Sequence, residues 1–301
     1  MRSGDDDGTR WSGWGAPRVP CVPSARQLVA GEIVLIVALV AYLGVGAVAG
    51  LLAGLLGVGG GLVIVPMLVF VFTRQGFPPE SLMHLALGTS MASIVFTSVS
   101  SFRAHQRRGA VDWSIVRGIT PGILAGTFLG TWIASRLSTM LLKGCFTAFL
   151  YAVAVQMLLD AKPRPTRGIP KAAGTTAVGG AIGVVSSLVG IGGGSLSVPF
   201  MTWCNVPVHR AIGTSAAIGF PIALAGSAGY ILNGLRVGGL PPNAVGFVFL
   251  PALAAIATAS VTTAPLGAWI AHRLPVSRLK RAFALLLLVM GTRLLLDLLR
   301  R

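Results

Sequence analysis

The residues of this chain that could do chemistry are hydrogen-bond donors in two short glycine-rich stretches. The first stretch, over 50–66, reads GLLAGLLGVGGGLVIVP, and the second, over 183–199, reads GVVSSLVGIGGGSLSVP. Aligned without a gap, Gly57 falls on Gly190 (190 − 57 = 133), and the two glycine triplets coincide. Consecutive glycines allow positive φ angles and a close approach of the backbone. Amides at the start of a helix bind anions, so the pattern predicts an anion site.

Hydroxyl groups recur beside both stretches. Thr89 and Ser90 match Thr214 and Ser215 in the shared pattern A-[LI]-G-T-S, whereas Ser195 has no such partner, because its matching position is Leu62. The predicted anion-binding residues are Gly59, Gly60, Gly61, Gly192, Gly193, Gly194, Ser195, Thr89, Ser90, Thr214 and Ser215. Two simpler interpretations stay open: the glycines permit close helix packing, and the hydroxyls bond to a carbonyl of the preceding turn.

Ionisable groups inside the apolar segments are scarce. All eight carboxylates fall in tails, loops or the ends of apolar segments, although a proton-coupled carrier usually keeps an ionisable group within the membrane. Coupling to protons would therefore use histidines or a proton carried by the substrate itself. The candidates are His84, His209 and His105. The alternatives are that these histidines are ordinary polar side chains, and that backbone carbonyls at the breaks coordinate sodium.

The composition is that of an integral membrane protein. Of 301 residues, 54% are hydrophobic and 11% charged, and the mean hydropathy is +0.81. The 24 lysines and arginines outnumber the eight acidic residues. They lie between apolar runs, which indicates membrane topology and an anionic substrate rather than nucleic acid as the partner. The three cysteines are isolated, so no metal site or cofactor is expected, and no catalytic motif indicates an enzyme.

The elements that must position these donors form two repeated halves. We predict an N-terminal disordered extension over 1–30, a first membrane repeat over 31–160, a linker over 161–170 and a second membrane repeat over 171–301. In each half a long apolar segment breaks at the glycines and continues as a short block, before three further long segments. The fold class is an all-α polytopic membrane protein, with four to five transmembrane segments and a glycine-broken re-entrant segment or half-helix per half.

Two topologies remain open at this point. With four crossings per half, most basic loops share the N-terminal side, in agreement with the positive-inside rule. With five crossings the basic clusters divide almost evenly, but the repeats are inverted, as in many transporters. Both versions place the two termini on one side of the cell membrane, which we expect to be the cytoplasmic side.

The paired elements GLLGVGGG…VP and SLVGIGGG…VP, each followed by A-[LI]-G-T-S, resemble the TauE/SafE family of sulfite and organosulfonate transporters. The resemblance covers about residues 33–299. It implies a cytoplasmic-membrane carrier for a small sulfur-containing anion, such as sulfite, thiosulfate, sulfoacetate or a related sulfonate. The alternative functions are a small-anion channel and a carrier for a non-sulfur organic anion.

Overall fold

The computed structural model describes residues 25–57, 60–159, 168, 170–271 and 276–299. Contacts divide the chain into two parts, residues 1–37 and 38–301. The first part holds the beginning of helix α1 (Ala25–Leu56), and the second holds the rest of α1 and every other element. Most of the predicted N-terminal extension and most of the predicted linker lie outside the described residues, as does Gly59.

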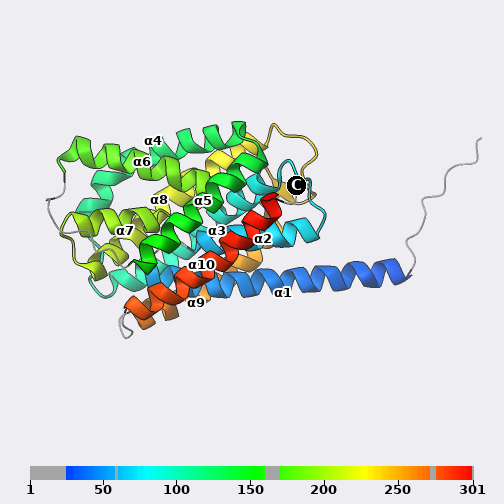
Figure 1. Ribbon diagram of the computed structural model, residues 1–301, viewed down its shortest axis with the longest axis horizontal. Helices are drawn as coiled ribbons and strands as arrows, with labels where there is room; N and C mark the ends of the chain where they lie inside the picture. The colour runs from blue at the N-terminus through cyan, green and yellow to red at the C-terminus, as the bar shows by residue number, and fades with distance from the viewer. Residues whose placement is uncertain (1–24, 58–59, 160–167, 169, 272–275, 300–301) are drawn as a thin grey trace, which may run out of the picture. The chain divides into compact units, whose positions relative to one another are not determined.

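Ten helices are described, and their lengths follow one order twice. A long helix, a short helix and three long helices make up each series (Figure 1). The first series is α1, α2 (Gly61–Arg74), α3 (Leu82–Gln106), α4 (Trp113–Arg136) and α5 (Thr139–Leu158). The second is α6 (Ala172–Val189), α7 (Gly194–Trp203), α8 (Val208–Gly234), α9 (Leu250–Ala271) and α10 (Val276–Leu299). Seven of the described helices are long and apolar enough to cross a membrane, so the predicted all-α polytopic fold class is confirmed.

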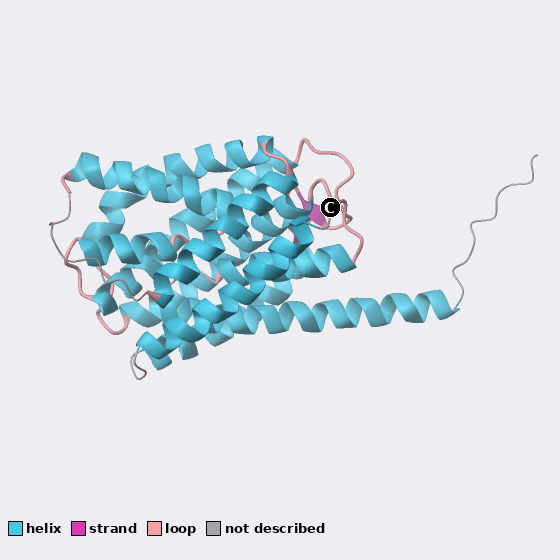
Figure 2. Ribbon diagram, viewed as in Figure 1, coloured by secondary structure: helices cyan, strands magenta, loops and turns pink. Residues whose placement is uncertain are grey.

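A small hairpin precedes α9, where the sequence predicts an apolar segment beginning at Ala244. Strands β1 (Ala244–Val245) and β2 (Val248–Phe249) pair antiparallel there (Figure 2), and the helix begins only at Leu250. The turn between the strands contains Gly246 at φ 56°. Because this left-handed conformation interrupts a helix, hydropathy alone places the start of the segment too early.

The short helix α2 folds back along α1. The Tyr42 hydroxyl, in α1, donates a 2.8 Å hydrogen bond to Oε1 of Gln75, which follows the last residue of α2. The ring of Phe72 also lies 6.4 Å from that of Tyr42, edge to face. Residues 33 positions apart are therefore side by side, and α2 returns toward the end at which Tyr42 lies. For the first series of helices, this geometry favours the five-segment alternative.

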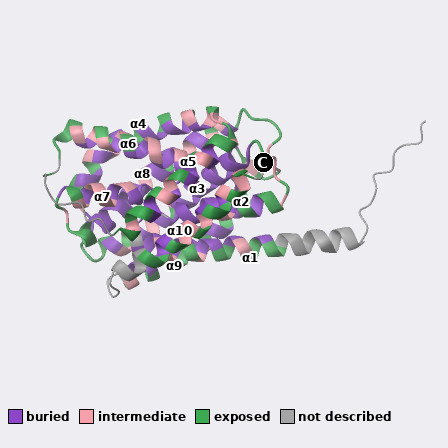
Figure 3. Cartoon of the chain, in the orientation of Figure 1, coloured by how far each residue is buried: buried purple, intermediate pink, exposed green. Residues whose placement is uncertain are grey.

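Helices α3 and α8 pack against each other and are the most enclosed of the candidate spans (Figure 3). Of the most apolar window of each helix, 83% is buried in α3 and 72% in α8, against 28–44% in the other five candidate spans. Outer helices pack on one another through glycines, which let two backbones approach. Gly126 of α4 contacts Gly180 of α6, and Gly50 of α1 contacts Ser260 of α9. The candidate site must therefore lie beside α3 and α8.

Candidate anion-binding site

Both glycine-rich stretches break the helix in the same way. Gly57 and Gly190, which follow α1 and α6, have φ angles of 68° and 71°. Gly60 and Gly193, which cap α2 and α7 at their N-termini, have φ angles of 76° and 75°. Residues with a Cβ avoid this left-handed region, so glycine is required at these positions. The first amides of α2 and α7 have no acceptor within their own helix, and Gly61 and Gly194 are both buried.

The two breaks meet inside the protein. A Cβ atom added to Gly61 would overlap the carbonyl oxygen of Gly190 and lie 2.9 Å from Cα of Ile191. The N-terminus of α2 therefore lies directly against the break that precedes α7. Residues about 130 positions apart in the chain (191 − 61 = 130), one from each glycine-rich stretch, are therefore in contact.

Two serines hold these breaks crosswise. Ser90 Oγ, on α3, donates to the carbonyl oxygen of Gly190 at 2.9 Å. Ser215 Oγ, on α8, donates to the carbonyl oxygen of Gly57 at 3.0 Å, and accepts a 2.9 Å bond from Ser197 Oγ. A break leaves carbonyl groups without helical partners, and these hydroxyls satisfy them. Both serines are thus placed beside the breaks, with their hydroxyl protons already donated to backbone.

Two threonines make a second crosswise pair. Thr89 Oγ1 accepts a 2.9 Å bond from the amide of Phe249, and Thr214 Oγ1 accepts one of the same length from the amide of Asp112. The Asp112 carboxylate caps α4 through Ser114, whose hydroxyl and amide hold the pKa of that carboxyl below its usual range. Thr89 therefore anchors α3 to strand β2, and Thr214 anchors α8 to the loop before α4, so both hydroxyl groups lie in backbone contacts.

Two buried serine hydroxyls near the second break lack such contacts. Within the described part of the chain, neither Ser195 Oγ nor Ser186 Oγ has a hydrogen-bond partner, although the two residues are 5% and 0% exposed. Ser186 Oγ lies 3.3 Å from where a Cβ on Gly193 would stand. A buried hydroxyl without a partner is costly, which indicates that a ligand or water uses it. Ser186 is not among the residues predicted from the sequence. The aligned first stretch has Ala53 at the matching position, and this difference was a usable signal.

A small cavity of about 10 Å³ adjoins the breaks, about the space that one water occupies. Its walls include Gly57 from the first break and Gly219, whose Cβ position is 3.2 Å from the carbonyl oxygen of Gly192. Ser98 and Ser101 supply the hydroxyls. The sequence analysis missed these two serines as well. Their signal in the sequence was a run of hydroxyl residues along α3, of which the buried members are Thr89, Ser90, Ser93, Thr97, Ser98 and Ser101.

The three candidate histidines do not come together. His84 and His105 lie 21 residues apart on α3, about 30 Å along a helix. His84 Nε2 donates to the carbonyl oxygen of Ala134 and His105 Nε2 to that of Gly54, each across 3.1 Å. His209 lies near the start of α8 and is exposed. Each buried histidine ties α3 to another helix, so their described contacts are structural.

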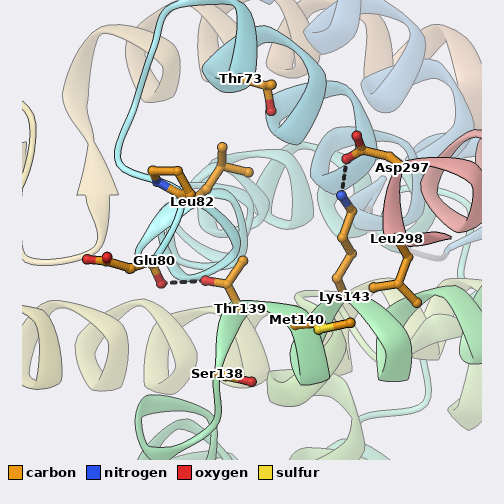
Figure 4. A pocket seen from close by; sticks show the side chains of 10 residues that line it. Thr73, Glu80, Leu82, Ser138, Thr139, Met140, Lys143, Asp297 and Leu298 are labelled. Atoms are coloured by element: carbon orange, nitrogen blue, oxygen red, sulfur yellow. Dashed lines mark hydrogen bonds and ion pairs between the residues drawn. The ribbon is translucent and has the colours of Figure 1, made fainter. Parts of the chain in front are cut away.

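A larger pocket of about 330 Å³ lies between the loop before α3, the start of α5 and the end of α10 (Figure 4). Lys143 points across it to Asp297, and the two form an ion pair. The Lys143 side chain is 8% exposed and that of Asp297 is 47% exposed. Glu80 also lines the pocket. The lysine is neutralised and a second carboxylate is near, so this pocket is a poorer place for an anion than the breaks.

Comparisons with known proteins agree with a membrane transporter. A family model described as "Sulfite exporter TauE/SafE" matches residues 42–294. A probable membrane transporter protein of Haemophilus influenzae is 38% identical over 248 residues, which cover 82% of this chain and 94% of that protein. Probable membrane transporter proteins of Methanocaldococcus jannaschii and of Bacillus subtilis (YunE) are 28% and 29% identical. The matches cover 82% and 63% of this chain, and 91% and 77% of those proteins.

No solved structure matches the chain. The family model nevertheless spans both glycine-rich stretches and the helices that hold them. The chain therefore belongs to the TauE/SafE family of membrane transporters.

Proposed function

We propose that this protein is a secondary transporter, not an enzyme, that moves a small sulfur-containing anion across the cytoplasmic membrane. Sulfite, thiosulfate, sulfoacetate and related sulfonates are the candidate substrates. The family description names sulfite export, and these anions share a compact group of oxygens that accept several hydrogen bonds. The observation that carries the proposal is the contact between Gly61, the first residue of α2, and the carbonyl oxygen of Gly190 in the break before α7.

The proposed site has donors from both series of helices. The first amides of α2 and α7 point the positive ends of two helix dipoles at the bound anion. Ser195 and Ser186 add free hydroxyls, and Ser90 and Ser215 fix the carbonyl groups that would otherwise repel it. No full positive charge is needed, which avoids the cost of placing one deep in the membrane.

The two repeats, the inner membrane and the cytoplasmic position of both termini are parts of this proposal. Coupling to protons or to another ion is a further part. His84 and His105 already donate to carbonyl groups, so a proton carried by the substrate itself would avoid breaking these bonds; His209 is the third candidate.

Uptake into proteoliposomes tests the function. Labelled sulfite, thiosulfate and sulfoacetate would be compared with acetate and phosphate, with and without a pH gradient. Saturable uptake of one sulfur anion that also shows counterflow supports a carrier. Flux that neither saturates nor shows counterflow would indicate a channel, and saturable flux of acetate alone would indicate a non-sulfur organic anion. Absence of flux for every sulfur anion, with the protein shown to be folded, would contradict the proposed substrate.

A further inference from the structure

A groove of about 490 Å³ runs between α3 and α9, away from the proposed anion site. Two side-chain hydrogen bonds join α3 to α9 beside the groove. Ser100 Oγ donates to the carbonyl oxygen of Val261 at 2.8 Å, and Thr97 Oγ1 lies 2.6 Å from Ser260 Oγ. These bonds hold the two helices that form the groove at a fixed separation. We call it the α3–α9 groove, and its lining includes Val95, Phe96, Val99, Arg103, Arg107 and Val261.

The charges of the groove gather at one end of α3. Arg103 and Arg107 are four residues apart, so one helical turn separates them on the same face. No carboxylate lines the groove, and neither guanidinium forms an ion pair with any described residue. The neighbouring Arg108 is different, because its Nη1 donates a 2.7 Å bond to the carbonyl oxygen of Ala268. Arg103 and Arg107 thus present uncompensated positive charge at the groove.

Apart from Ser100, the rest of the groove is lined by apolar residues, and its walls are partly exposed. Phe96 is 49% exposed and Val261 is 37% exposed, as expected for side chains that face lipid in a protein of this class. From Val95 to Arg107, α3 rises about 18 Å. Positive charge at one end and a long apolar wall at the other match an amphiphile with an anionic head.

The second series of helices lacks this feature. The interval between the matching histidines (209 − 84 = 125) places Ala228 and Leu232 of α8 at the positions of Arg103 and Arg107. Neither can bind an anion. The matching helix of the second series therefore folds without arginines at these positions. A ligand particular to the α3–α9 groove would explain why α3 has them.

We propose that the α3–α9 groove binds an anionic phospholipid. The phosphate lies between Arg103 and Arg107, which suit a bidentate bond to its oxygens. One acyl chain lies along Phe96, Val99 and Val261. Basic pockets between transmembrane helices bind anionic headgroups in this way. This proposal is independent of which substrate the protein transports.

Lipid retention by the purified full-length protein tests the proposal. Native mass spectrometry would compare phosphatidylglycerol with phosphatidylcholine of the same acyl chains. We expect wild type to retain phosphatidylglycerol about tenfold better, and the double variant Arg103→Gln/Arg107→Gln to lose that preference. The matched control is Arg74→Gln/Arg136→Gln, because each of these arginines stacks on an aromatic ring of its own helix. This control should behave as wild type.

A third variant keeps the charges and fills the groove. Val99→Trp should also lose the retained phosphatidylglycerol, since the acyl chain would have no room. Inorganic phosphate at millimolar concentration should not displace the lipid. Equal retention of both lipids by wild type, equal losses in the two double variants, or displacement by inorganic phosphate would each overturn the proposal.

Discussion

The hydroxyl of Ser90 donates a 2.9 Å hydrogen bond to the carbonyl oxygen of Gly190, so α3 holds the break that precedes α7. The reciprocal bond, from Ser215 to the carbonyl oxygen of Gly57 at 3.0 Å, lets α8 hold the break that precedes α2. Each break is therefore fixed by the other series of helices. A movement of α3 relative to α8 must disturb both breaks together, and this would couple the two sides of the proposed binding site during transport.

Removing either hydroxyl should weaken the protein and slow transport. Ser90→Ala leaves the Gly190 carbonyl buried without this bond, at a cost of about 1–3 kcal/mol, and Ser215→Ala does the same at Gly57. We expect a lower thermal midpoint and reduced uptake for both variants. The control is Ser93→Ala, because Ser93 Oγ donates to Thr89 within its own helix. Contradictory results would be equal effects of Ser93→Ala and Ser90→Ala on stability and uptake.

The glycines at the N-termini of the short helices should tolerate no side chain. A Cβ at Gly60 would stand 2.7 Å from the carbonyl oxygen of Ala49, and a left-handed φ adds about 1–2 kcal/mol for a residue with a Cβ. Gly60→Ala should therefore abolish uptake. Gly76→Ala separates the two costs, because Gly76 has a φ of 74° but no atom within 4 Å of its Cβ position. Gly76→Ala should lower stability and leave transport intact. Normal uptake by both variants would show that the glycine breaks are not part of the anion site.

Replacing either partner of the ion pair between Lys143 and Asp297 should destabilise the protein, but by unequal amounts. Asp297→Asn leaves the buried Lys143 ammonium without its charge partner, and an unsatisfied buried group costs about 1–3 kcal/mol or more. Lys143→Met leaves only the half-exposed Asp297, which water solvates, so the loss should be about 1 kcal/mol or less. Chemical denaturation or thermal melting in detergent measures both. A larger loss for Lys143→Met would show that packing of the lysine stem outweighs its charge.

The class of fold follows from the sequence because it depends on long apolar runs and on two breaks with the same residues. Hydropathy places the start of the segment that contains α9 at Ala244, which is too early. Two residues with positive φ, Asn243 and Gly246, bend the chain before α9. Hydropathy also gives no partner for Asp297. The structure pairs Asp297 with Lys143, which lies 154 residues earlier in the chain. Such contacts depend on how helices pack, which local spacing does not contain.

The candidate site follows from the sequence only in outline. The glycines and the serine–threonine pairs are visible as repeated motifs, and the structure brings most of them to the breaks. Their roles are not visible, because a hydroxyl that binds an anion and one that bonds to a distant carbonyl have the same sequence. Ser186 and Ser98 are not among the predicted residues, because neither is repeated, as the aligned Ala53 shows for Ser186, and neither adjoins a glycine triplet as Ser195 does.

The unpartnered hydroxyls near the second break give a test in which stability and transport move in opposite directions. Ser186→Ala and Ser195→Ala each remove a buried hydroxyl that has no described partner. A buried polar group without a bond is unfavourable, so each variant should be as stable as wild type or more stable, by up to about 1 kcal/mol. If these hydroxyls bind the anion, the KM for uptake should rise about five- to tenfold in each variant, one hydrogen bond being worth about 1 kcal/mol or slightly more.

Ser187→Ala is the matched control for this pair, because Ser187 Oγ donates to the carbonyl oxygen of Val184 in its own helix. It should leave the KM unchanged. Thermal melting and saturation curves for uptake, measured on the same preparations, distinguish the possible roles. A raised KM with unchanged or raised stability places the hydroxyls at the anion. Lowered stability with an unchanged KM would instead mean that Ser186 and Ser195 bond to water or backbone in the folded protein, and would remove them from the binding site.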